Sequence, residues 1–563
     1  MTAPDRRTLV YLAALLVGLG AVVGFGDAYV LRVASLVGIY AIAAIGYQLV
    51  FGRLGLLSLA QGALFGIGAY ASALVILELG MPVPLGLLAA VLVPAAVGAL
   101  VALPIARLES HYVALATLGL AQLALLAATN LEVTGGANGL YGVPPIAAGP
   151  IGIGPLSVGG GLPMLALVWA LVLVALLVSR WVLSGGRLAR LATIRDAPHA
   201  ALTLGLNPVP ARLALFAVAG GLGGLAGGLQ AHGLGVVSPA VTGFEVMVTV
   251  LTIAVVGGRG SALGAVAGAA LLVPLPEFLR FLEGGYLVAY GVVLLAAIVL
   301  VPRGLDGRLR DRLPRRPPRL PEVARPSVRR RGKALIVDGL RKRFGGVTAL
   351  DGVSFSVPAG TVVGLIGANG SGKTTALNLI SGLETPDGGQ IRLGGVPLGD
   401  RAAHHRSVLG LGRGFQHPEV PEGLFVLEAA AVGAADRSVA MAALDRVGLA
   451  GRAADPVAAL GAAELRRLDL ARALATGPEA LILDEPAAGL TGDERAALAA
   501  LLRRLAAEGL AVLVVDHGMD FLMPLADRIV CLDAGRVLAA GTPEEVRRNP
   551  AVVAAYLGKG VAS

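Results

Sequence analysis

The chain has 563 residues, of which 56% are hydrophobic and 15% are charged. Because soluble domains usually carry about 25% charged residues, part of this chain must lie in an apolar medium. The length is too great for one small module, and the composition excludes both a disordered protein and a purely soluble enzyme.

The charged residues divide the chain into three stretches. Residues 1–302 contain 12 Arg, no Lys and 9 acidic residues, whereas residues 334–563 contain 22 basic and 25 acidic residues. Residues 303–333 hold 12 basic and 3 acidic residues, a surplus equal to the net charge of +9. We therefore expect a membrane domain over residues 1–302, a basic Pro-rich cytoplasmic linker over 303–333 and a soluble domain over 334–563. The linker charge predicts contact with anionic membrane lipid rather than with nucleic acid.

Apolar runs in the first stretch predict about ten membrane spans, since a span needs roughly 20 apolar residues. They cover residues 9–26, 29–50, 56–79, 83–106, 111–130, 162–183, 211–232, 244–257, 261–276 and 286–302. With a cytoplasmic N-terminus, nearly all arginines of these spans and loops face the cytoplasm, and only Arg32 and Arg280 face outward. This is the asymmetry of the positive-inside rule, and it places the soluble domain in the cytoplasm. Glycines in the stretch 220–228 are expected to let helices pack closely.

A phosphate-binding loop is the strongest motif of the second half. The run 362–366 predicts a short buried strand, and an apolar helix follows the loop. The loop reads Gly367-Ala-Asn369-Gly370-Ser371-Gly372-Lys373-Thr374-Thr375. In such loops backbone N–H groups point at a β-phosphate, the lysine neutralises the β and γ oxygens, and the first threonine hydroxyl ligates Mg²⁺. The pattern predicts an α/β P-loop NTPase domain that binds ATP and Mg²⁺.

Two more strand ends carry chemically useful side chains. The apolar run 480–483 leads into Asp484 and Glu485, which suit a water-mediated Mg²⁺ contact and a general base, respectively. The run 511–515 leads toward His517, which could hold a γ-phosphate. Because the carboxyl ends of parallel strands share one crevice, we expect these residues to meet the phosphate loop there.

Further pieces of the second half carry a family resemblance. They are Leu340-Arg-Lys-Arg-Phe344-Gly-Gly, Arg413-Gly-Phe415-Gln416, Asp484-Glu-Pro-Ala-Ala-Gly489-Leu490 and the tail from Gly541-Thr-Pro-Glu-Glu-Val to Ala555-Tyr556-Leu557-Gly558. With them this half resembles the ATPase subunits of ABC transporters, most of all the branched-chain amino-acid group. The resemblance implies ATP hydrolysis. It also implies that Phe344 stacks on adenine, that Gln416 touches Mg²⁺ and water, and that His517 is the switch histidine.

The first half has its own set of matching pieces. They are Gly55-Leu-Leu-Ser58-Leu59-Ala-Gln61-Gly, Phe65-Gly-Ile-Gly-Ala-Tyr70, Thr134-Gly135-Gly136-Ala-Asn-Gly139-Leu140, Ile194-Arg195-Asp196, Ala200-Ala201, Gly205 and Pro302-Arg303-Gly304-Leu305. These pieces are similar to permeases of the same transport system. The resemblance implies that the loop 184–212, which holds Arg195, Asp196, Ala200, Ala201 and Gly205, is the coupling segment that contacts the ATPase.

The signature segment departs from the family form, Leu-Ser-Gly-Gly-Gln. It reads Leu460-Gly461-Ala462-Ala463-Glu464 here. Gly461 lacks the hydroxyl that would bind the opposite subunit's γ-phosphate, and Glu464 puts an anion near a phosphate. Nucleotide sites of this family form between two ATPase subunits. We therefore predict a heteromeric pair in which this chain's phosphate loop acts with the intact signature of a partner.

Together these patterns predict a polytopic α-helical membrane domain fused to an ABC-type ATPase in the bacterial plasma membrane. We expect an importer of branched-chain or other hydrophobic amino acids, working with a second permease, a second ATPase and an extracytoplasmic substrate-binding protein. Two alternatives stay open: the same machine importing urea or short-chain amides, and an ATP-binding regulatory subunit with little hydrolysis of its own. Intact Lys373, Glu485 and His517 favour hydrolysis over the second alternative.

Overall fold

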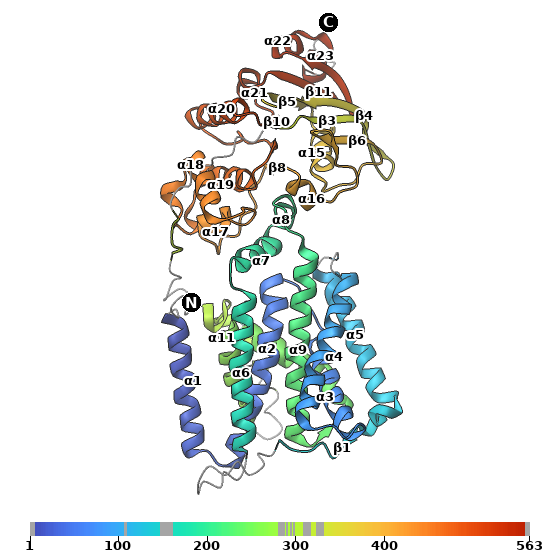
Figure 1. The fold of residues 1–563 in the computed structure, drawn as a ribbon, viewed down its shortest axis with the longest axis vertical. Helices are drawn as coiled ribbons and strands as arrows, with labels where there is room; N and C mark the ends of the chain where they lie inside the picture. Colours follow the sequence, from blue (N-terminus) through green and yellow to red (C-terminus); the bar gives the residue numbers. More distant parts are fainter. Residues whose placement is uncertain are drawn as a thin grey trace. The chain divides into compact units, whose positions relative to one another are not determined.

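The computed structural model describes most of the chain (Figure 1). The described residues are 6–105, 108, 110–146, 161–279, 288, 291–292, 295–296, 299–307, 317–321 and 332–557. The chain forms two compact units, one of Met1–Arg187 with Val209–Arg316 and one of Leu188–Pro208 with Pro317–Ser563. The segment Leu188–Pro208 thus belongs to the same unit as the soluble half, although it lies between two apolar helices in the sequence.

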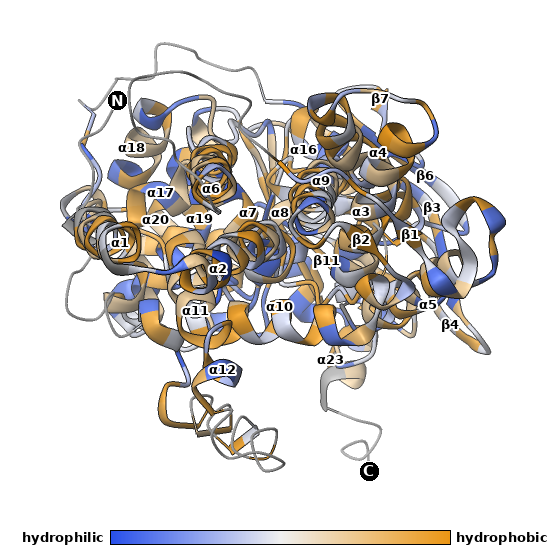
Figure 2. Ribbon diagram, turned by 90° about the horizontal axis from the view of Figure 1, so that it is seen from below, coloured by the Kyte–Doolittle hydropathy of each residue, from blue (hydrophilic) through white to orange (hydrophobic). Residues whose placement is uncertain are grey.

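The first unit is built from apolar helices. They are α1 (Arg6–Phe25), α2 (Ala28–Tyr47), the π-helix η1 (Gln48–Leu54), α3 (Gln61–Leu77), α4 (Val83–Ile105), α5 (Ser110–Asn130), α6 (Leu162–Val182), α9 (Pro208–Leu234), α10 (Phe244–Gly257), α11 (Ala262–Leu272) and α12 (Leu275–Leu279). Six helical stretches are long and apolar enough to cross a membrane, and three further apolar helices are shorter. In Figure 2 the ribbons of α6 and α11 are coloured largely as hydrophobic. These nine helical stretches coincide with nine of the ten predicted spans, and eight of the 17 residues of the tenth, 286–302, lie outside the described residues.

The boundary between the second and third predicted spans differs from expectation. After α2 the chain continues as a π-helix to Leu54, and the next helix begins only at Gln61. The buried Gln48 side chain explains the change of helix type: its Nε2 donates to Ala254 O (2.8 Å) and Gly258 O (3.0 Å). These bonds fix the Gln48 side chain to the end of α10 at the point where α2 passes into the π-helix, a rare type of helix.

Glycines bring α3 and α9 into backbone contact. A Cβ atom added at Gly227 would overlap Phe65 O, and one added at Gly68 would overlap Gly224. No side chain fits at either position, so the stretch 220–228 has the packing role predicted from the sequence.

Replacing Gly227 by valine should therefore separate α3 from α9. Overpacking of this kind costs about 1–3 kcal/mol, and we expect a lower melting temperature for the purified protein in detergent. The matched control is Gly119→Val on α5, because nothing lies within 4 Å of a Cβ added at Gly119. Equal losses in the two variants would contradict a packing role for Gly227.

The second unit contains two sheets. Their strands are β3 (Leu335–Phe344), β4 (Val347–Val357), β5 (Val362–Gly367), β6 (Gly388–Leu393), β7 (Val396–Pro397), β8 (Leu411–Gly414), β9 (Ala480–Asp484), β10 (Ala511–Val515), β11 (Arg528–Asp533) and β12 (Arg536–Gly541). The larger sheet has the order β12-β11-β5-β10-β9-β8 and the smaller β4-β3-β6-β7. Strands β11, β5, β10, β9 and β8 run parallel. Their carboxyl ends consequently meet at one edge of the larger sheet.

The second unit also contains α-helices. They are α7 (Arg187–Asp196), α8 (Pro198–Thr203), α15 (Lys373–Ser381), α16 (Ala403–Val408), α17 (Val426–Ala430), α18 (Arg437–Arg446), α19 (Ala462–Ala475), α20 (Gly492–Ala507), α21 (Met519–Leu525), α22 (Pro543–Arg548) and α23 (Pro550–Leu557). Every residue of β5, β9 and β10 is buried. Strands buried on both faces need apolar runs without alternation, which explains why these three were recognisable in the sequence.

The chain's single cysteine reports on the integrity of this sheet. Cys531 lies in β11 and is 0% exposed, and burial raises the pKa of its thiol to about 11. At pH 8 only about one thiol in a thousand is then ionised, and only the thiolate reacts. In the folded protein we expect iodoacetamide to label Cys531 only as fast as the domain unfolds. In denaturant we expect full labelling. Rapid labelling of the folded protein would show that β11 is not buried.

Candidate functional site

The phosphate loop is held in shape by glycines and by its own lysine. Gly370 and Gly372 have φ values of 80° and 101°, a left-handed conformation that favours glycine. A Cβ atom at Gly372 would lie 2.6 Å from Ala349 O. Lys373 Nζ donates to the carbonyls of Gly367 and Ala368, each at 2.8 Å. The lysine therefore closes the loop at the point where β5 leads into α15.

The donors of this loop fit a nucleotide phosphate. Lys373 is buried, and burial lowers its pKa while Glu485 and Asp484 oppose this shift. Within the described residues, the buried Ser371 hydroxyl has no hydrogen-bond partner. The exposed Thr374 stands in the first turn of α15, where a helix N-terminus favours an anion. The remaining predicted loop residues, Asn369 and Thr375, lie at exposed and half-buried positions in the same segment.

Three of the predicted catalytic residues lie together at the carboxyl edge of the sheet. Gln416 Nε2 donates to Glu485 Oε2 at 2.7 Å. His517 Nε2 lies 3.0 Å from Glu485 Oε1. Asp484 is buried at the end of β9, directly before Glu485. The structure thus brings Gln416, Glu485 and His517 into one hydrogen-bonded group, as the parallel strand order requires.

Glu485 has an unusual backbone. Its φ is 46°, one of two positive values among the described non-glycine residues. Glu485 N donates to Val515 O at 2.7 Å, which anchors this conformation on the neighbouring strand β10. A non-glycine residue in such a conformation costs on the order of 1–3 kcal/mol and is concentrated at functional sites. The strained turn aims the Glu485 carboxylate at Gln416 and His517.

Asp484 is supported by a buried arginine whose role the sequence did not reveal. Arg413 Nη1 donates to Ser381 Oγ at 2.6 Å, and Arg413 Nη2 lies 4.0 Å from Asp484 Oδ2. Burial raises the pKa of Asp484, and Arg413 opposes this shift. Arg413 thereby connects the end of α15 to the carboxylate proposed to contact Mg²⁺. The sequence signals for Arg413 were its place in the family-matching piece Arg413-Gly-Phe415-Gln416 and its charge next to an apolar run, and neither pointed to a contact with Asp484.

A second residue missed by sequence reasoning positions the loop that carries Gln416. Asp469 Oδ2 accepts a hydrogen bond from Phe415 N at 3.0 Å, and Asp469 Oδ1 lies 3.4 Å from Arg472 Nη1. Both side chains are buried. A carboxylate between Leu468 and Leu470 was the available signal, because an acid on the apolar side of a helix needs a buried partner.

Phe344, the residue implied to stack on adenine, lies at the end of β3 on the smaller sheet. Its side chain is 47% exposed, and Lys342 Nζ lies 5.3 Å from the centre of its ring. An exposed ring with a cation on one face is available for stacking on the other. Its contact with adenine stays a prediction.

The signature segment forms the start of α19. Glu464 Oε2 accepts a hydrogen bond from Gly461 N at 3.0 Å, and Glu464 Oε1 accepts one from Arg452 Nη1 at 2.7 Å. Glu464 therefore caps its own helix, and it shares the Arg452 guanidinium with Asp455. Ala462, Ala463 and Gly461 offer no side-chain donor, and Leu460 is buried.

The predicted coupling segment packs within the second unit. Ala200 and Ala201 on α8 are buried, and Arg195 Nε pairs with Asp196 Oδ1 at 2.6 Å. Gly205 has a φ of 83°, and a Cβ atom there would lie 3.6 Å from Ser407 Oγ on α16.

The other side of this segment meets the helices that follow the Gln416 loop. A Cβ atom at Gly433 would lie 2.8 Å from Leu204 O and 2.9 Å from Thr476 Cγ2. Leu204 is buried in the same apolar cluster as Ala430 and Leu474. The segment therefore lies between α16 and the helical part around α17 and α19.

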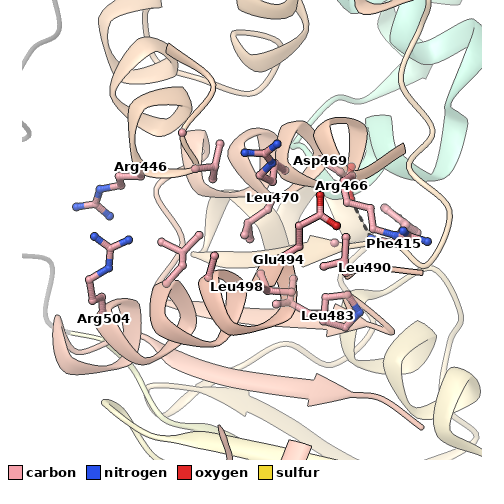
Figure 3. Close-up of a pocket in the computed structure, with 18 of the residues that line it drawn as sticks. Phe415, Arg446, Arg466, Asp469, Leu470, Leu483, Leu490, Glu494, Leu498 and Arg504 are labelled. Atoms are coloured by element: carbon pink, nitrogen blue, oxygen red, sulfur yellow. Dashed lines mark hydrogen bonds between the residues drawn. The ribbon is translucent and has the colours of Figure 1, made fainter. Parts of the chain in front are cut away.

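A cavity of about 590 Å³ adjoins the site between α18, α19 and α20 (Figure 3). Leucine side chains form much of its wall, and they are Leu470, Leu483, Leu490, Leu498 and Leu501. In Figure 3 Phe415 lies at one end and the guanidinium groups of Arg446 and Arg504 at the other. Asp484 also lines the cavity. The cavity therefore reaches the end of β9 that carries Asp484.

Comparison with known families gives matches along both halves of the chain. Residues 29–301 match the branched-chain amino acid transport system permease component. Residues 350–488 match the ABC transporter family. Residues 536–562 match the branched-chain amino acid ATP-binding cassette transporter family.

Individual relatives match the second half. The high-affinity branched-chain amino acid transport ATP-binding protein BraF of Pseudomonas aeruginosa is 37% identical over 249 residues, which are 40% of this chain and 98% of BraF. LivG of Escherichia coli strain K12, which has the same description, is 35% identical over 251 residues, again 40% of this chain and 98% of LivG. A solved nucleotide-free ATP-binding cassette from an ABC transporter is 26% identical, with a TM-score of 0.39, and covers 40% of this chain and 99% of that chain.

Proposed function

Because the chain belongs to the branched-chain amino-acid ABC transporter family, with a permease component and an ATP-binding component in one polypeptide, we propose that it imports branched-chain or other hydrophobic amino acids. It is a multi-pass membrane protein with a transport ATPase domain. The observation that carries the proposed cargo is that both halves match the same branched-chain system.

Glu485 is proposed as the general base of ATP hydrolysis. Its two carboxylate oxygens contact Gln416 and His517, so its position is fixed from both sides. A carboxylate in this place accepts a proton from the attacking water while the Gln416 amide orients that water. Lys373 and the loop amides neutralise charge on the phosphate oxygens.

The same site fits Mg²⁺ bound with the nucleotide. Asp484 and Thr374 supply the hard oxygen ligands that Mg²⁺ prefers, and the Gln416 amide oxygen is a further candidate. Asp484 lies at the strand end beside the phosphate loop, where the phosphate oxygens would complete the coordination. When bound, the metal supplies charge neutralisation at the transferred phosphate.

The second ATPase is proposed to be a different chain. Gly461 and Ala462 give a partner's nucleotide no hydroxyl, whereas the phosphate loop, Asp484 and Glu485 of this chain are complete. We expect the purified chain to hydrolyse ATP slowly and a second ATPase with an intact signature to raise the rate at least tenfold. Fast hydrolysis by this chain as a homodimer would contradict the heteromeric pair.

The remaining parts of the machine follow from the permease half. A second permease and an extracytoplasmic substrate-binding protein are proposed partners, since neither is recognisable in the sequence of this chain. In this arrangement the N-terminus and the ATPase face the cytoplasm of a bacterial cell. Most of the basic linker 303–333 lies outside the described residues, and its contact with anionic lipid stays a prediction.

Competition for uptake tests the cargo. Cells carrying this chain and its neighbouring transport genes should take up labelled leucine, and unlabelled isoleucine should compete while urea does not. A parallel strain with Lys373→Ala should show only background uptake. Urea uptake without leucine uptake would contradict the proposed cargo but not the assignment as an ABC importer. Leucine uptake that survives Lys373→Ala would favour the alternative of a regulatory ATP-binding subunit.

A further inference from the structure

Arg406 is a buried arginine that no step of the proposed reaction uses. It lies on α16, is 1% exposed and donates to four backbone carbonyls. The acceptors are Gly399 O (2.6 Å), Arg401 O (2.7 Å), Leu379 O (2.5 Å) and Ile380 O (2.9 Å). Burial lowers its pKa to about 10, so it is a cation at pH 7. A buried charge needs such compensation, and because the four carbonyls come from two segments, the end of α15 and the turn 399–401, Arg406 on α16 joins both of them.

Two of these carbonyls belong to the last turn of the phosphate-loop helix. Helix α15 begins at Lys373 and, at about 1.5 Å per residue, is a rod of roughly 13 Å. Its N-terminus favours the phosphate anion and its C-terminus favours the Arg406 cation, because the helix dipole points from one to the other. A Cβ atom at Gly382 would lie 2.6 Å from Arg406 Nε, so this glycine leaves room for the guanidinium. A displacement of the phosphate loop is thus carried to Arg406 by one short helix.

The helix that bears Arg406 also contacts the coupling segment. Helix α16 packs against α8. Ser407, the residue after Arg406, and Val408 lie 3.6 Å and 3.8 Å from the position of a Cβ atom at Gly205. From the phosphate loop to the coupling segment, the chain of contacts runs through α15, Arg406, α16 and α8. Every contact in it lies within one compact unit.

We propose that Arg406 is a positioning residue that relays nucleotide occupancy of the phosphate loop to Leu188–Pro208, the part of the coupling segment 184–212 that belongs to this unit. The guanidinium holds the end of α15, the turn 399–401 and α16 as one body, so α16 moves with α15 and displaces α8. The inference rests on the proposed transport function. Loss of Arg406 should leave the nucleotide site in place and break the transmission from it.

Hydrogen exchange of the assembled transporter tests the relay without any transport assay. A non-hydrolysable ATP analogue should change the exchange of backbone amides in residues 198–205 of the wild-type chain at least threefold. In Arg406→Gln the change should fall below 1.5-fold, while the analogue still protects the loop 367–375. The matched control is Arg401→Ala: its exposed side chain is removed but the carbonyl that Arg406 uses is kept. Equal changes in the wild type and Arg406→Gln would overturn the relay.

A second readout separates a relay from a purely structural role. Leucine uptake per ATP hydrolysed should fall at least fivefold in Arg406→Gln, with hydrolysis kept at half or more of the wild-type rate. Arg406→Lys, which keeps the cation with fewer donors, should give an intermediate ratio and serves as the test if Arg406→Gln does not fold. Uptake and hydrolysis that fall in parallel would overturn the proposal.

Failure of the proposed cargo remains distinguishable from failure of the relay. If wild-type protein takes up no leucine, the cargo is wrong, and the exchange experiment still decides whether residues 198–205 respond to nucleotide through Arg406. If wild-type uptake is normal and Arg406→Gln shows the wild-type response, only the relay is wrong.

Discussion

Replacing Glu485 by glutamine should lower ATP hydrolysis by the assembled transporter at least about 100-fold, the usual contribution of a general base. The amide has nearly the same shape and can still contact Gln416 and His517, so the site should keep its geometry. It cannot accept a proton from water. The affinity for ATP should therefore stay within about twofold of wild type, because the contacts that hold bound ATP do not require a proton to be accepted at residue 485.

A matched substitution elsewhere controls for the loss of a carboxylate. Glu544 on α22 is exposed and pairs with Arg547 in the same helix. Glu544→Gln should leave both hydrolysis and ATP binding unchanged. Hydrolysis is measured as phosphate release and ATP binding with a fluorescent ATP analogue. The two assays separate loss of catalysis from loss of binding. If Glu485→Gln retains more than a tenth of wild-type hydrolysis, another residue is the base.

Replacing Asp469 by alanine should have the largest effect on the stability of the ATPase half. The substitution leaves the buried Arg472 guanidinium without its carboxylate and Phe415 N without its acceptor. Breaking a buried pair by removing one partner costs about 3–5 kcal/mol, a large part of a domain's stability. We expect the midpoint of chemical unfolding, followed by far-UV circular dichroism, to shift to a clearly lower denaturant concentration.

The exposed pair on α22 again supplies the control. Glu544→Ala removes one member of a solvent-screened pair, which is worth about 0–1 kcal/mol. Asp469→Ala should in addition reduce hydrolysis in the folded protein, since the loop carrying Gln416 loses its anchor on α19. A shift no larger than that of Glu544→Ala would show that Asp469 and Arg472 do not support this loop.

Much of the architecture was predictable because its signals are local. A charge-poor stretch needs an apolar medium, and uninterrupted apolar strands belong in a buried parallel sheet. The strand, loop and helix around Lys373 form a continuous motif. Asp484 ends β9, Glu485 follows it, and His517 lies two residues after β10, so the order of the parallel strands brings these residues to one edge of the sheet.

Other features were not predictable because they depend on contacts between distant segments. Arg406 and Arg413 look like ordinary surface charges in the sequence, and only the fold shows them buried against backbone carbonyls and Asp484. The helix cap made by Glu464 was missed for a related reason. The bond to Gly461 N and the pair with Arg452 depend on where α19 begins, and the expected closeness of this carboxylate to a phosphate stays a prediction.

The helical boundaries of the first unit show a similar limit. Hydropathy locates an apolar run but does not distinguish an α-helix from a π-helix. The change of helix type at Gln48 follows from hydrogen bonds to Ala254 and Gly258, more than 200 residues later.

The most direct measurement is ATP-driven leucine uptake into proteoliposomes that contain this chain, its partner subunits and the binding protein. The wild-type chain and Glu485→Gln would be compared, with every partner unchanged. We predict rapid uptake with wild type and uptake at the ATP-free background with Glu485→Gln, because the site on this chain powers the import. Uptake that persists in Glu485→Gln would contradict this and move the hydrolysis that drives transport to the partner ATPase.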